Sequence, residues 1–81
     1  MGILKENING TIIEVDVESS NLVKAIYDTQ SKNLKVTFKT GNIYEYEDVP
    51  WEVFTKFRMA ESQGKYFSAN IARKYTYKKL Q

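Results

Sequence analysis

The 81-residue sequence contains no cysteine and no histidine. Without cysteine the chain has no disulfide framework and no thiol nucleophile, and without histidine it lacks the usual general base near neutral pH and most zinc ligands. Its four glycines are isolated, which excludes a glycine-rich phosphate loop. Glu45, Glu47 and Asp48 lie close together, but two of them alternate with tyrosines as on a solvated strand. We therefore expect a protein with no catalytic residues, no metal site and no cofactor.

Long apolar runs are also missing. No stretch approaches the roughly 20 residues that cross a bilayer, and the start of the chain lacks the apolar segment of a signal peptide. The sequence therefore predicts a cytoplasmic protein without membrane contact. A length of 81 residues allows one domain with one core, and 42% apolar residues are typical of a folded chain.

Charge is divided unevenly along the chain. Residues 1–52 contain five lysines and nine acidic residues, a net charge of −4, whereas residues 53–81 contain seven basic residues and one glutamate, a net charge of +6. Helices and tails often carry basic residues for solubility alone. The alternative is an anionic partner, with phosphate the first choice.

β-branched and alternating apolar side chains predict strands at residues 11–17, 22–28 and 34–38. In the second of these, Val23, Ala25 and Tyr27 are expected to share one face. Residues 1–10 are expected to be loose. A further strand is centred on Tyr44-Glu45-Tyr46, after a turn that contains Gly41.

The length of that turn follows from side-chain parity. A two-residue loop would pair Phe38 with Glu45 and place a charge among the core residues. A three-residue loop at residues 39–41, or one position later, keeps Val36 and Tyr44 on the same face. We therefore expect the tyrosines of this strand to point toward the covered side of the sheet.

Helical patterns follow the strands. Pro50 suits the first position of a helix, and Gly64 is the expected residue that stops it. A second, short helix is predicted from Ser68, as its N-cap, to Tyr75. The predicted fold is α+β: a single domain at residues 11–81, with an antiparallel meander of three to four strands followed by two C-terminal helices on one face.

Basic and aromatic residues of the C-terminal third are the candidate binding residues, because cations hold phosphates and rings stack on bases. Tyr27, Tyr44 and Tyr46 are interpreted as core residues. The predicted phosphate contacts are Lys65, Arg73, Lys74, Lys78 and Lys79, and the predicted stacking residues are Tyr66 and Tyr77. Trp51, at the start of the first helix, is either an exposed anchor for another protein or a cover for a strand end.

Several motifs in combination resemble the KTSC domain family. They are Ser19-Ser20-Asn21, Leu34-x-Val36-x-Phe38, Tyr44-x-Tyr46, Val49-Pro50 and Ser62-x-Gly64-x-Tyr66-Phe67, within residues 17–80. The resemblance implies a small domain of the kind found at the C-terminus of some lysyl-tRNA synthetases and as stand-alone bacterial and phage proteins, and RNA binding as an expectation. Ser68, Ala72 and Thr76 depart from the family pattern. Because Ala72 stands where the family pattern has a basic residue, a neighbouring basic residue would have to make any phosphate contact at this point.

Three functions are compatible with these features. The leading hypothesis is a non-enzymatic module that binds RNA or another nucleotide-bearing anion through the basic, tyrosine-containing segment. The second is a protein that sequesters a small nucleotide, such as a cyclic nucleotide signal, between protomers of a homo-oligomer, since one domain this small forms no deep pocket. The third is a protein-interaction domain that docks through Trp51, Met59 and the acidic strand.

Overall fold

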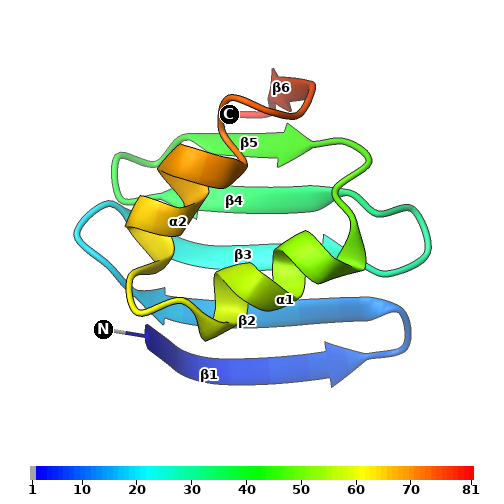
Figure 1. The fold of residues 1–81 in the computed structure, drawn as a ribbon, viewed down its shortest axis with the longest axis horizontal. Coiled ribbons are helices and arrows are strands. Elements are labelled where there is room, and N and C mark those ends of the chain that lie inside the picture. The colour runs from blue at the N-terminus through cyan, green and yellow to red at the C-terminus, as the bar shows by residue number, and fades with distance from the viewer. Residues whose placement is uncertain (1) are drawn as a thin grey trace.

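Six antiparallel strands form one sheet, and two helices cover one of its faces (Figure 1). This computed structural model describes residues 2–81, with side chains from residue 5 onward. The elements are β1 (Gly2–Asn9), β2 (Ile12–Glu18), β3 (Leu22–Asp28), β4 (Leu34–Phe38), β5 (Ile43–Tyr46), α1 (Trp51–Met59), α2 (Gln63–Asn70) and β6 (Tyr77–Lys79). Each strand pairs with its neighbour in sequence. Among the described residues, neither helix has the length and apolarity to cross a bilayer.

The α+β class is confirmed, but the expected count of three to four strands is too low because both edge strands were missed. Residues 1–10 were expected to be loose, yet Gly2–Asn9 pair with β2 through a turn in which Gly10 has a φ of +64°. β6 pairs with β5 at the opposite edge, and all three of its residues are exposed. These strands are held by backbone pairing and carry little of the apolar alternation that identifies a strand.

A β-bulge changes the expected face of one residue in β3. The predicted trio included Val23, which is 39% exposed, whereas Leu22 is fully buried beside Ala25 and Tyr27. The pairing with β4 shifts register between Leu22 and Lys24, so one extra residue reverses the side-chain alternation at this point. The sequence carries no sign of this bulge.

The β4–β5 hairpin has the predicted register. Val36 is opposite Tyr44, and Leu34 is opposite Tyr46. The loop contains residues 39–41, and Gly41 adopts a φ of +95°, which favours glycine. The parity argument is therefore confirmed, and both tyrosines lie on the face covered by the helices.

The predicted helix boundaries are wrong. Pro50 is the N-cap of α1 and not its first helical residue, and α1 ends at Met59, before Gly64. Ser62 is the N-cap of α2, because its Oγ accepts a hydrogen bond from the backbone N–H of Lys65 at 3.3 Å. Ser68, the predicted N-cap, therefore lies inside α2. Gly64, the predicted stop, is also inside this helix.

Aromatic side chains of the helices complete the core. Tyr27 stacks on Phe54 with ring centroids 4.5 Å apart, and Phe67 contacts Phe38 and Tyr46 edge to face. One polar side chain, Gln63, is buried among them with 1% exposure. Its Nε2 donates to three carbonyl oxygens at the C-terminal end of α1, those of Phe57, Arg58 and Ala60. Gln63 therefore caps α1 from the start of α2.

Candidate functional site

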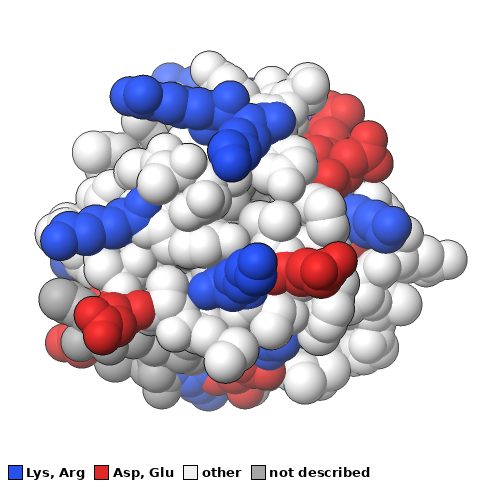
Figure 2. Space-filling view, in the orientation of Figure 1, with Lys and Arg blue, Asp and Glu red and all other residues white. Residues whose placement is uncertain are grey.

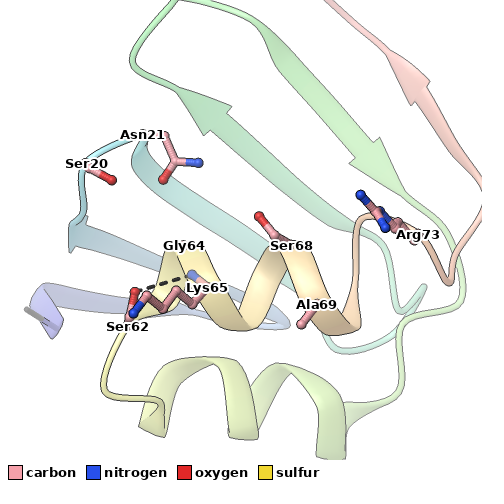
Figure 3. Close-up of a pocket in the computed structure, with 8 residues that line it drawn as sticks. All are labelled: Ser20, Asn21, Ser62, Gly64, Lys65, Ser68, Ala69 and Arg73. Carbon is pink, nitrogen blue, oxygen red and sulfur yellow. Dashed lines mark hydrogen bonds between the residues drawn. The ribbon is translucent and has the colours of Figure 1, made fainter.

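A shallow groove runs between α2 and the turn that joins β2 to β3 (Figure 3). This α2 groove has a volume of about 580 Å³ and is lined by Ser20, Asn21, Ser62, Gly64, Lys65, Ser68, Ala69 and Arg73. Its lining contains two cations, three hydroxyl groups and one amide, but no carboxylate. Such a surface favours an anionic ligand rich in hydrogen-bond acceptors.

The β2–β3 turn is held by its own hydrogen bonds. The Ser19 hydroxyl donates to Asn21 Oδ1 at 3.0 Å and accepts from the N–H groups of Asn21 and Leu22 at 3.3 and 3.4 Å. The N–H of Lys39 donates to the carbonyl of Asn21 at 2.9 Å. In Figure 3, Ser20 and Asn21 lie across the groove from α2. These hydrogen bonds therefore hold one side of the α2 groove in place.

Gly64 lets α2 approach this turn closely. A Cβ atom at this position would lie 2.7 Å from Asn21 Oδ1 and 3.0 Å from Ser19 Oγ, so the Asn21 side chain would have to shift. This contact explains why a glycine, a poor helix former, occupies the first turn of α2. Gly64 thus sets the width of the α2 groove.

Gly64→Ala is expected to lower the free energy of unfolding by about 1 to 2 kcal/mol. Overpacking costs roughly 1 to 3 kcal/mol, and the better helix propensity of alanine offsets part of it. Urea denaturation of the purified protein measures the difference. Adding Asn21→Ala to the same chain should recover most of the loss, since it removes the atom in contact. A Gly64→Ala protein more stable than the original would contradict this account.

A second groove lies on the other side of α2, between the two helices. This α1–α2 groove has a volume of about 290 Å³ and is lined by Pro50, Glu52, Val53, Lys56, Tyr66, Asn70, Lys74 and Tyr75. Burial, and then the nearby phenol of Tyr75, raise the pKa of Tyr66 above its usual value. The Asn70 amide donates to the carbonyl of Tyr66 at 3.3 Å. Two tyrosines and an amide thus share a small pocket with two lysines.

The structure separates the predicted phosphate contacts. Lys65 and Arg73 line the α2 groove, whereas Lys74 lies in the α1–α2 groove. Lys78 points away from the helices and pairs with Glu45, at a distance of 3.9 Å between Lys78 Nζ and Glu45 Oε1. Lys79 is opposite Tyr44 in the sheet. Figure 2 shows basic side chains in groups separated by neutral and acidic surface.

The two predicted stacking residues have different surroundings. Tyr66 is half-buried in the α1–α2 groove. Tyr77 is 54% exposed on β6, and its ring packs against Tyr44 and Tyr46 with centroids 5.5 and 5.4 Å apart. Burial raises the pKa of Tyr46 to about 12, with smaller contributions from the phenols of Tyr77 and Tyr44. Tyr77 therefore extends the core toward the edge of the sheet.

Trp51 combines the two roles considered for it. The residue is 46% exposed, but the centre of its ring also lies 6.1 Å from the ring centres of Tyr27 and Phe54. The Arg58 guanidinium stands 5.1 Å from the centre of the Trp51 ring and pairs with Glu6 of β1 at 2.8 Å. This arrangement joins α1 to the edge strand.

The turn and helix-cap residues of the α2 groove were not predicted as site residues. Ser20, Asn21, Ser62 and Ser68 line it beside the predicted cations. A partial signal was present, since the serine-rich turn and the Ser62-x-Gly64 segment are both motifs of the family resemblance. With α2 in its observed position, helical spacing also places residues 65 and 69 in one row.

Comparisons with known proteins agree with the resemblance. The sequence model of the KTSC domain family matches residues 18–75. An uncharacterized protein of Stutzerimonas stutzeri is 39% identical over 54 residues, which cover 67% of this chain and 76% of that protein. A lysine–tRNA ligase of Trichormus variabilis is 33% identical over 63 residues, 78% of this chain but 11% of the ligase. The crystal structure of a KTSC domain protein from Yersinia pestis matches with a TM-score of 0.81 and 27% identity, covering 86% of this chain and 99% of that one.

Proposed function

The chain belongs to the KTSC domain family, and we propose that it is a non-enzymatic module that binds RNA, or another phosphate-bearing nucleotide ligand, in the α2 groove. The observation that carries this proposal is the pairing of Lys65 and Arg73 with neutral hydrogen-bond donors in a lining without carboxylates. Phosphate oxygens are charged acceptors, and basic, hydroxyl and amide groups together form the usual protein surface for them.

Other grooves of the described surface are less suited to a phosphate. The α1–α2 groove includes Glu52, a groove on the uncovered sheet face includes Asp28 and Glu45, and a third beside β2 includes Asp16 and Glu18. A carboxylate near a phosphate repels it and lowers affinity. Because the chain matches part of a lysine–tRNA ligase, we favour RNA over other phosphate-bearing ligands in this proposal.

A salt titration with single-stranded RNA tests the proposal. Each phosphate contact on a single strand contributes about 0.7 to the slope of log affinity against log salt. Lys65→Ala/Arg73→Ala should therefore make the slope shallower by about 1.4 and weaken binding at low salt by roughly tenfold or more. Fluorescence anisotropy of labelled RNA at several salt concentrations measures both quantities.

Lys78→Ala/Lys79→Ala is the matched control, because it removes the same charge from β6 and leaves the α2 groove intact. We expect this variant to keep most of the affinity for RNA and most of the slope of log affinity against log salt. Equal losses in the two variants would point to diffuse attraction by the basic segment and refute the groove. Absence of binding to both RNA and DNA at low salt would end the proposal altogether.

A further inference from the structure

α2 and the turn after it form a ridge with a groove on each side. One row of residues, spaced four apart, lines the first groove, and the residue that directly follows each of them in sequence lines the second. The row in the α2 groove is Lys65, Ala69 and Arg73, and the row in the α1–α2 groove is Tyr66, Asn70 and Lys74. One ligand that crosses this ridge can therefore contact both grooves.

The two grooves differ in chemistry. The α2 groove offers cations and hydroxyls, whereas the α1–α2 groove adds the rings of Tyr66 and Tyr75 and the Asn70 amide. At about 290 Å³ it has the size of the smallest ligand pockets, so it accommodates one small group rather than an extended one. Aromatic rings beside an amide are a common surface for an unstacked base.

Asn70 has groups available for recognition. Its Nδ2 donates one hydrogen bond, to the Tyr66 carbonyl, which leaves a second N–H and the Oδ1 acceptor. A side-chain amide with one donor and one acceptor can bond to two adjacent groups on a base edge. Lys56 and Lys74 on the same groove outnumber its one carboxylate, Glu52, so its net charge is compatible with a strand whose phosphates lie in the α2 groove.

We propose that the α1–α2 groove is a nucleobase subsite: a base stacks on Tyr66 and Tyr75 and bonds to Asn70, while phosphates of the same strand lie in the α2 groove. This subsite rests on the proposed function of the α2 groove. Because a helix with its side chains is about 10 to 12 Å across, a ligand that fills both grooves spans more than one nucleotide. The expected ligand is therefore a single strand of several nucleotides.

Two probes with the same phosphates test the subsite. One is a five-nucleotide oligoadenylate, and the other is an abasic strand of equal length. The original protein should bind the first more tightly by roughly five- to one-hundredfold, the range that base stacking on an aromatic side chain provides. Tyr75→Ala should remove this difference without changing affinity for the abasic strand.

Tyr77→Ala is the control, because it removes a tyrosine outside the α1–α2 groove and should keep the preference for bases. Tyr75→Phe should keep it too, since the ring remains. If Tyr75→Ala melts below the assay temperature, Asn70→Ala replaces it and should reduce the preference several-fold.

The two proposals fail in different ways. Equal binding of both strands by the original protein would refute the base subsite and leave the phosphate groove standing. Loss of the base preference in Tyr77→Ala but not in Tyr75→Ala would also refute the subsite. Failure of both strands to bind would refute the phosphate groove, and the subsite with it.

Discussion

Tyr27→Ala is expected to lower the free energy of unfolding by about 3 to 5 kcal/mol, the range for removing a large buried aromatic side chain. Tyr27 is fully buried, and its ring stacks on Phe54. The substitution would remove ring contacts on both the sheet and α1. A domain of this size has roughly 4 to 12 kcal/mol of stability, so much of the variant would be unfolded at ambient temperature.

Tyr27→Phe separates the hydroxyl from the ring. The Tyr27 hydroxyl donates to the carbonyl of Val49 at 2.6 Å, between β3 and the segment that leads into α1. Phenylalanine would leave that buried carbonyl without a donor, at a cost of roughly 1 to 3 kcal/mol. Urea denaturation followed by the fluorescence of Trp51, which lies beside Tyr27, measures both variants. Tyr77→Phe serves as the exposed control, and a Tyr27→Phe protein as stable as the original would contradict the role of this bond.

Gln63→Glu is the second substitution with a large expected effect. It replaces the amide that donates to three carbonyl oxygens with a carboxylate, which can only accept hydrogen bonds when ionised. At neutral pH a buried charge would then face three acceptors, at a cost of several kcal/mol. Thermal unfolding at pH 7 should show the loss directly.

The pH dependence identifies the cause. Burial among acceptors favours the protonated acid, so the folded-state pKa of the new glutamate lies above its unfolded value of about 4.3. The loss in free energy of unfolding of Gln63→Glu, relative to the original protein, should be smallest below the unfolded-state pKa. It should grow as the pH rises through the folded-state pKa. Gln63→Leu lacks the charge and should be destabilised to a similar degree at every pH. A pH-independent deficit in Gln63→Glu would exclude the buried charge as its cause.

Sequence reasoning succeeded where one face of a strand is fully apolar. The β4–β5 register follows from parity because a slip would bury Glu45, which is a large energetic difference. β1 and β6 were missed because an edge strand is held by backbone hydrogen bonds and its exposed side chains need no pattern. The bulge at Val23 likewise reflects the pairing of β3 with β4, which local sequence does not report.

The candidate site was predicted in part. Lys65 and Arg73 were predicted from charge, and both line the α2 groove. The hydroxyl and amide groups opposite them come from a turn some 40 residues earlier in the chain. The two sides of the groove come together through the close approach of Gly64 to Asn21. The sequence did not indicate this approach, because Gly64 was expected to end a helix and not to lie within one.

The six-stranded sheet also affects where the domain can be cut. A chain trimmed to residues 18–75, the segment shared with the family, would keep both helices but lose β1, β6 and all of β2 except Glu18. Ile13, Val15 and Val17 would leave the core, and β3 would become an edge. The sheet therefore extends beyond the segment by which the family is recognised, and we expect fragments to fold only if they retain both outer strands.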